Sequence, residues 1–365
     1  MFFCDQATHL WKARQRLISF PPCAFASYTN RDNLIALLVA AAAKLHGDKT
    51  ENPIHTKVMG AVHKLLAEKG RQRALELGAY DRPVVEAAAA YLGDEDTAIG
   101  YLYSGWCQAA LPHRRLPDTE GWQIQSDHTS LIVEPGMRLG PAGKPVPVGI
   151  PYGSRAKLIL IYLQSEAIRT QSREIELGGS LRAWLTKLGI TVSGPSAAAV
   201  RDQAERISRC RLTFQIQKGG ATGLVNQNIV DEALFLEGQD EGQTSLFLNT
   251  ARLSEGFFAQ LKRHPVPLEE AAIRRLSNNS MALDAYAWLA YRLHSLRSPT
   301  LVPWPALMGQ FGGGFGALKH FKPRFVANVR LALAVYPSAR VDEEPDGLML
   351  HHSAPPVARK LITVR

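Results

Sequence analysis

The sequence has few cysteines, and their spacing makes no metal or redox site. Cys4, Cys23, Cys107 and Cys210 lie far apart, and no two of them form a C-x-x-C pair. Because a zinc cage or a dithiol motif needs closely spaced cysteines, neither is indicated, and reduced thiols in a cytoplasm are expected. We predict no metal ion and no cofactor.

Long hydrophobic runs are also absent. The longest apolar stretch, at residues 33–43, is well short of the roughly 18 residues that span a bilayer. No small-residue cleavage signal convincingly follows it. The sequence therefore predicts a soluble, cytoplasmic protein without a membrane partner.

Motifs of nucleotide hydrolysis and covalent catalysis are missing as well. The stretch "AGKP" at 142–145 lacks the upstream glycine spacing and the hydroxyl of a phosphate-binding loop, which argues against an ATP-driven motor. His351 and His352 are adjacent, so on a strand they point to opposite faces and cannot share a metal as the histidines of a nicking enzyme do. Cys107 and His113 lack an evident electropositive pocket, so packing is the preferred role of Cys107. We predict no catalytic residue and no enzymatic activity.

Positive charge is what the chain has in excess. Its 42 Lys and Arg against 33 Asp and Glu give a formal charge of +9 over 365 residues. Such a balance favours polyanionic partners, nucleic acid before an acidic membrane. With 46% hydrophobic residues the chain can bury the cores of two or three domains.

Breaks in composition suggest five segments. We expect a variable leader at 1–57, which could precede the true translation start, and a helical N-terminal region at 58–150. The Gly- and Pro-rich stretch 140–151 marks the first domain boundary, since it suits neither a helix nor a central strand. Two domains at 151–250 and 251–357 follow, and then a tail at 358–365.

The two domains repeat one order of elements. Each has a helix, an extended piece, two further helices and a hairpin, which is the order of a winged helix-turn-helix. The fold class predicted is therefore α+β and predominantly helical, with two tandem winged-helix domains after a helical N-terminal region. The first copy is read at 154–170, 173–178, 180–190 and 196–209 with strands at 210–218 and 244–249, and the second at 281–296, 299–303, 304–311, 317–337 and 339–353.

The third helix of each unit combines an apolar stripe with cations. In helix-turn-helix folds this element enters the major groove. Pro323 is awkward inside the second one, so we expect a kink or a helix start near Lys322. The inward residues predicted are Val200, Ala204 and Ile207 in the first helix, and Leu318, Phe321, Phe325, Val329, Ala332 and Leu333 in the second. The DNA-binding residues predicted are Arg201, Arg206, Arg209, Arg211 and the wing-tip Lys218 in the first unit, and Lys319, Lys322, Arg324 and Arg330 in the second. Arg114 and Arg115 are further candidates for phosphate contact.

Several separated motifs resemble the plasmid-encoded RepA replication proteins of proteobacteria. They are "YLYSGWCQAALPHRRLPD" at 101–118, "GIPYGSRAKLIL" at 149–160, "REIELGGSL" at 173–181, "RHPVPL" at 263–268, "ALDAYAWLAYR" at 282–292 and "FKPRF...LALAVYPSARV" at 321–341. The resemblance extends over about residues 58 to 357. It implies an initiator of tandem winged helices that binds repeated duplex sites at a plasmid origin, and it casts the third-helix cations as DNA contacts.

The function expected is therefore plasmid replication initiation, with opening of the origin, loading of the host helicase through host initiator proteins and repression of its own gene. A transcriptional repressor with two DNA-reading modules is one alternative, and a rolling-circle nicking enzyme is a second. Whether the active form is a monomer or a homodimer stays open.

Overall fold

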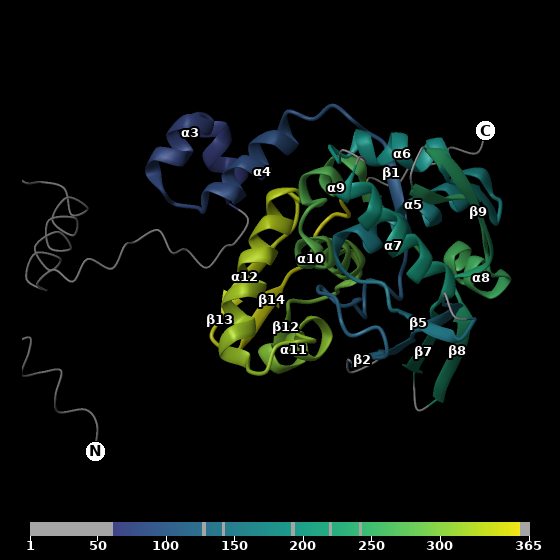
Figure 1. The fold of residues 1–365 in the computed structure, drawn as a ribbon. Helices are drawn as coiled ribbons and strands as arrows, with labels where there is room; N and C mark the ends of the chain where they lie inside the picture. Colours follow the sequence, from purple (N-terminus) through teal and green to yellow (C-terminus); the bar gives the residue numbers. More distant parts are fainter. Residues whose placement is uncertain are drawn as a thin grey trace, which may run out of the picture. The chain divides into compact units, whose positions relative to one another are not determined.

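The computed structural model describes residues 61–125, 129–140, 143–190, 194–218, 221–240 and 243–357. These residues all belong to one of the two compact units of the chain, Thr56–Arg365 (Figure 1). The predicted leader at 1–57 and the tail at 358–365 lie outside the described residues. No described helix is long and apolar enough to cross a membrane.

The N-terminal region begins with two helices and continues in strands. Helix α3 (Val62–Leu77) packs on α4 (Arg82–Leu92), and both join a small core with Ala334. The prediction that 58–150 is helical is wrong beyond residue 92, because strands occupy much of 99–149. The alternating burial of 129–134 shows why: every second side chain faces the core, as the period of a strand requires. The strands are β1 (Ile99–Tyr103), β2 (Trp122–Gln125), β3 (Thr129–Glu134), β4 (Gly136–Leu139) and β5 (Pro145–Gly149).

The next segment contains the first set of repeated elements. Its strands β6, β10 and β9 form a three-stranded sheet in the order β6-β10-β9. Strands β7 and β8 are inserted between the third helix and this sheet, and they pair with β3 in the sheet β2-β3-β7-β8. The hairpin predicted from 210–218 and 244–249 is thus wrong, since the two strands belong to different sheets. The elements are α5 (Gly153–Thr170), β6 (Glu174–Glu176), α6 (Gly178–Lys187), α7 (Pro195–Arg209), β7 (Arg211–Lys218), β8 (Ala221–Asn228), β9 (Val230–Asp240) and β10 (Gln243–Leu253).

The second set follows a connecting segment of α8 (Glu255–Arg263), β11 (Pro265–Glu269) and α9 (Glu270–Leu276). Its strands form a sheet in the order β12-β14-β13. In both sets the strand after the first helix therefore pairs with the last strand. The element order predicted for this segment is confirmed. The elements are α10 (Ser280–Arg292), a 3-10 turn (Leu293–Ser295), β12 (Thr300–Pro303), α11 (Trp304–Phe311), α12 (Leu318–Ala334), β13 (Val341–Glu344) and β14 (Gly347–Leu350).

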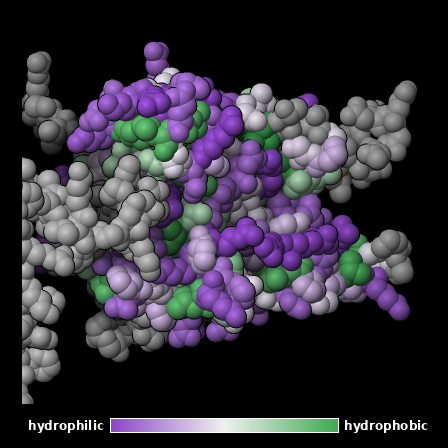
Figure 2. Space-filling view, turned by 90° about the vertical axis from the view of Figure 1, so that its left-hand side faces the viewer, coloured by the Kyte–Doolittle hydropathy of each residue, from purple (hydrophilic) through white to green (hydrophobic). Residues whose placement is uncertain are grey.

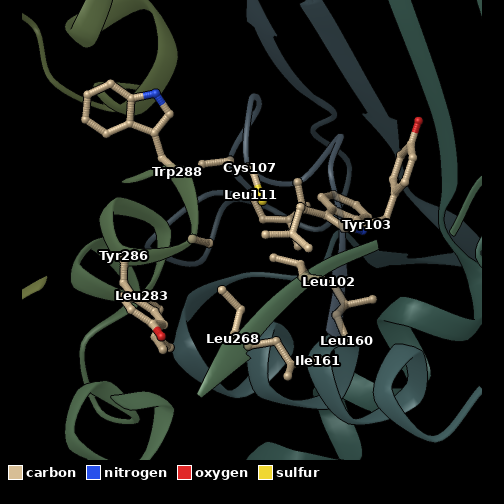
Figure 3. Close-up of a cluster of buried hydrophobic side chains, with 14 of the residues drawn as sticks. Leu102, Tyr103, Cys107, Leu111, Leu160, Ile161, Leu268, Leu283, Tyr286 and Trp288 are labelled. Carbon is tan, nitrogen blue, oxygen red and sulfur yellow. The ribbon is translucent and has the colours of Figure 1, made fainter. Parts of the chain in front are cut away.

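One hydrophobic core connects the N-terminal strands with both sets. Its buried side chains run in sequence from Leu102 to Leu350, and Figure 3 shows the part where β1, α5, β11 and α10 meet. Strand β1 pairs with β11 and β3 pairs with β7, so residues on both sides of position 150 share two sheets. Cys107 is buried in this core, and burial raises the pKa of its thiol well above the ordinary range, which fits a packing role. The boundaries at 150 and 250 stay predictions.

Candidate nucleic-acid interface

Helix α12 presents the predicted apolar stripe to the core. Phe321, Phe325 and Val329 are fully buried, and only Leu318 of the predicted stripe is exposed. The helix begins at Leu318 rather than near Lys322, so that part of the prediction is wrong. Pro323 lies inside the helix on its exposed face. Because proline has no N–H, the carbonyl of Lys319 lacks its helical donor, and on this face water can donate to it instead.

The cations of α12 differ in how they are paired. Lys319 is exposed and has no ion-pair partner among the described residues. Lys322 and Arg330 share the carboxylate of Glu343 on β13, at 3.9 and 3.4 Å. The Lys322 ammonium also lies 4.5 Å from the ring centre of Trp304. Two of the four cations predicted for α12 are thus partly neutralised by a carboxylate of the hairpin that follows the helix in sequence.

The surface on this side of the molecule is polar. Figure 2 views the described unit from the side on which α12 lies in Figure 1, and the visible side chains are mostly hydrophilic, with separate small hydrophobic patches. Isolated apolar residues of this kind are normal for a protein surface. What this face offers to a partner is therefore mainly charge and hydrogen-bonding groups.

Arg206 of α7 is a core residue, and its assignment as an outward DNA contact is wrong. Its side chain is 2% exposed and bonds the carboxylates of Asp202 and Asp118 at 2.9 and 3.0 Å. Gly149 makes room for it, since a Cβ at that position would lie 2.1 Å from the guanidinium Nη1. The reason for the error is that a carboxylate 88 residues away in sequence turns a surface cation into a buried one.

The other cations predicted for the first unit lie at the surface or beyond what the structure describes. Arg209 is exposed, pairs with Glu205 at 3.3 Å and donates to the carbonyl of Met137. Arg201 is half-buried on the same helix, and Arg211 is exposed at the start of β7. Lys218 ends β7, on the inserted hairpin rather than on the β9–β10 hairpin, and its side chain is outside the described part. The inward positions Val200, Ala204 and Ile207 are buried as predicted.

A cleft of about 700 Å³ lies between the two third helices. Helix α7 contributes Ala199 and Gln203, and α12 contributes Arg324 and Asn328. The first turns of α5 and α10 also line it, together with two loops that no local sequence pattern would bring there. In sequence, these further walls are residues 112–116, 152–155 at the start of α5, 278–281 at the start of α10, and 313–315, with Trp122.

The cleft is positively charged. Arg114, Arg115, Arg155 and Arg324 line it, and none of the described lining residues is acidic. Arg114 and Arg324 are exposed and have no ion-pair partner among the described residues. Arg155 donates to Asn278 Oδ1 at 3.2 Å, and burial lowers the pKa of its guanidinium. Arg115 pairs with Asp118 at 3.0 Å.

The two helix starts add to this field. Neither α5 nor α10 has an acidic residue in its first turn, and no side chain caps α5. The N–H of Gly153 already donates to the carbonyl of Pro112 at 2.8 Å, and Asn279 Oδ1 caps α10 by accepting from Ala282 N–H at 3.1 Å. The contribution of the two helix starts is therefore mainly the positive end of each helix dipole at this wall of the cleft.

A buried polar network holds α5 and α10 together beneath the cleft. Lys157 of α5 forms an ion pair with Asp284 of α10, and both side chains are nearly inaccessible. His113 bonds Ser280 Oγ at 2.9 Å through Nδ1. Burial, reinforced by the charge of Lys157, lowers the pKa of His113 to about 3, so its imidazole is neutral at pH 7. Asp284 has a pKa raised to about 6, because burial outweighs the attraction of Lys157. The network holds the cleft walls together, and it leaves Arg114 and Arg324 without a carboxylate partner among the described residues.

The structure gives no metal centre to this interface: among the described residues, no group of three or more His, Cys, Asp or Glu side chains could hold an ion. His351 instead bonds Asp342 at 2.8 Å. Sequence reasoning named Arg114, Arg115 and Arg324 but missed Arg155 and the cleft itself. The only local signal was a cation at the start of the helix predicted from residue 154.

Comparison with known proteins confirms the resemblance over part of the chain. Residues 150–301 match the model of the family described as plasmid encoded RepA protein. No curated protein matches the chain. The structure is similar to a crystal structure of selenomethionine-labelled domains 2 and 3 of RctB, with a TM-score of 0.45 and 12% identity, covering 69% of this chain and 99% of that one. A second crystal structure of these RctB domains has a TM-score of 0.39 and 12% identity, with coverage of 67% and 94%.

Proposed function

Because residues 150–301 match the plasmid-encoded RepA family, we propose that this chain is a plasmid replication initiator that binds repeated duplex sites at an origin. Phosphate contacts would set its register on the duplex, and a few helix residues would read bases. The binding energy would bend or destabilise an adjacent AT-rich segment, at which the host initiator and replicative helicase assemble. Repression of its own gene, a cytoplasmic location and a non-enzymatic role belong to the same proposal.

The observation that carries this proposal is the third helix α12 with its exposed cation. The strand orders β6-β10-β9 and β12-β14-β13 support two winged-helix modules, in which α7 and α12 are the third helices. In such a module the third helix approaches DNA with its polar flank while its apolar face packs inward. Lys319 lies on that flank, together with Lys322 and Arg330.

The inserted hairpin β7–β8 modifies the first module. It pairs with β3 and β2 of the N-terminal region rather than with β9 and β10. The wing of the first module is accordingly the β9–β10 hairpin, and Arg211 and Lys218 bracket a separate strand. We therefore expect Lys319, Lys322 and Arg330 of the second module to contribute more to phosphate binding than the cations of β7.

The test is fluorescence anisotropy of the full chain with a duplex of the repeats beside its gene and with a scrambled duplex, across a salt series. The repeat should bind roughly a thousandfold more tightly or better. Lys319→Ala should weaken binding and lower the salt slope by about one unit, because one phosphate contact is lost. Lys69→Ala, which removes an exposed lysine from α3, is the matched control and should leave the slope unchanged.

Two outcomes would contradict the proposal. Equal affinity for both duplexes would mean that the basic surface binds DNA without sequence preference. An unchanged slope in Lys319→Ala and in the double variant Lys319→Ala/Arg330→Ala would remove α12 from the interface. The non-enzymatic role has its own check: supercoiled origin plasmid incubated with the protein and Mg²⁺ should stay closed, whereas open circles would identify a nicking enzyme.

A further inference from the structure

The cleft between α7 and α12 is a surface separate from the cation flank of α12. At 100° per residue, Arg324 lies about 140° around the helix from Lys319. The two cations therefore face different directions, and Arg324 lines the cleft whereas Lys319 does not. A duplex on the Lys319 flank would leave the cleft arginines without a ligand.

The cationic wall of the cleft suits a phosphate. Arg114 and Arg324 are exposed, Arg155 adds a third guanidinium, and no carboxylate among the described lining residues opposes them. Arginine forks match phosphate geometry, and partial charge from two helix starts acts in the same direction. A negatively charged group in this cleft would meet attraction from three elements at once.

The remaining lining suits a nucleobase. The aromatic rings of Trp122, Tyr152 and Phe315 are half-buried and line the same cleft. Aromatic side chains beside a cationic groove are the combination on which unpaired bases stack. The exposed side chain of Asn278 adds an amide group that can bond the edge of a base, whereas the amide of Gln203 is buried and already bonds the Tyr152 backbone N–H and Asp202.

The size of the cleft separates a single strand from a duplex. Its volume of about 700 Å³ is that of a small-ligand site, for which roughly 300 to 1,000 Å³ is usual. A B-DNA duplex is wider than its own major groove, which is about 12 Å wide, so a duplex is too broad for a cleft of this volume. A stretch of one strand with its bases turned outward can do so.

We infer that this cleft binds a nucleoside phosphate, supplied as unpaired nucleotides of a DNA strand. Arg114, Arg155 and Arg324 hold the phosphates, and the bases stack against Trp122 and Phe315. The inference rests on the proposed function, because opening of an origin is what would present the strand. It adds a second DNA site, for the separated strand, to the duplex site on the other flank of α12.

The experiment measures the anisotropy of a labelled T-rich single strand of about 12 nucleotides, within the length range of single-strand sites. Unlabelled thymidine monophosphate and inorganic phosphate serve as competitors. Arg114→Gln and Phe315→Leu are the test variants, and Lys319→Ala is the control on the duplex flank. Arg114 is exposed and Phe315→Leu keeps an apolar side chain, and far-UV circular dichroism checks that each variant is folded.

We expect the strand to bind and both test variants to weaken it roughly tenfold, since one stacked base or one phosphate contact is lost. Phe315→Leu should leave duplex binding unchanged, and Lys319→Ala should leave strand binding unchanged. Wild-type affinity for the strand in both test variants would overturn the inference. So would displacement by inorganic phosphate, which would indicate a plain anion site, or binding of the mononucleotide as tight as the strand. Failure of the proposed function would look different, because the duplex repeats would then no longer bind preferentially.

Discussion

Arg206 has the charge expected of a DNA contact and the burial of a core residue. Its guanidinium bonds Asp118 and Asp202 and donates to the carbonyl of Ile150 at 3.4 Å. The two carboxylates are 35% and 39% exposed, so the buried group of this network is the guanidinium itself, and its removal leaves a cavity. The residue therefore holds α7 against the segment that leads into α5.

Arg206→Ala should lower the free energy of unfolding by about 2 to 4 kcal/mol, because it empties a buried site and removes both ion pairs of a buried guanidinium. Urea unfolding followed by tryptophan fluorescence measures this loss. Arg209→Ala removes an exposed cation from the next turn of the same helix and should cost less than about 1 kcal/mol. A stability of Arg206→Ala equal to that of Arg209→Ala would contradict the structural role.

Glu343 pairs with two cations of α12, so under the proposed function a duplex would compete with its carboxylate for them. Glu343→Gln should increase the affinity for the duplex repeats roughly two- to fivefold at low salt, because Lys322 and Arg330 lose a neighbouring carboxylate. The gain should shrink as salt rises. Glu68→Gln on α3 changes the net charge equally and is the control. If both variants gain affinity alike, net charge rather than this contact sets the difference.

The residue pattern within a helix could be predicted from the sequence, whereas the partners of its charges could not. The burial of Phe321, Phe325 and Val329 follows from their spacing along one helix face. The pairing of Arg206 with Asp118, however, depends on how two distant segments pack. The same limit hid Arg155, whose neighbours in the cleft come from other elements.

At the scale of elements, local signals located the helices of both repeated sets, but not α8 and α9 of the connecting segment. The strands β12, β13 and β14 were predicted because they are short extended segments beside turn residues. The pairing of β7 with β3 was not predictable, since a strand's own residues do not identify its neighbour in a sheet. The strand at 210–218 was consequently paired with residues 244–249 of β10, and Lys218 was placed at the tip of that hairpin.

An ion-pair network joins three elements near the start of the core. Asp94 accepts from Arg274 at 2.5 Å and from Arg275 at 2.9 Å, and Asp96 accepts from Lys187 of α6. Burial by itself would raise the pKa of Asp94, but hydrogen bonds from the Asp96 backbone and Arg274 lower it below the usual 3.8. Ionised Asp94 therefore stabilises the fold above that pH, and this contribution disappears as the pH falls through the lowered pKa.

Asp94→Asn should thus destabilise the protein by about 1.5 to 3 kcal/mol at pH 7, the range for hydrogen bonds to charged groups. Urea unfolding of both proteins at pH 7, 5 and 3 measures the difference. It should be constant at the two higher values and smaller at pH 3, where Asp94 of the wild type begins to take up a proton. A difference that grows on acidification would contradict the lowered pKa.

At the scale of the whole described unit, the two sets of repeated elements share their interior. The core that contains Leu163 of α5 also contains Leu333 of α12, and the buried pair of Lys157 and Asp284 links α5 to α10. The cleft exists because of this arrangement, since its walls come from both sets and from the N-terminal loops. A sequence divided at residues 150 and 250 hides such a site, because its walls are then distributed over three segments.

A shared core predicts that the two sets unfold together. Leu163→Ala and Leu333→Ala should each lower the midpoint of the same urea transition. Each should lower the free energy of unfolding by about 2 to 5 kcal/mol, because each leaves a cavity at a side chain that is 1% exposed. Tryptophan fluorescence and far-UV circular dichroism should report coincident curves for both variants. Leu139→Ala, at a side chain 76% exposed, should leave the midpoint unchanged. If either core variant instead splits the curve into two steps, the two sets are independent folding units and the cleft between them is free to open, because its walls are then held by separate cores.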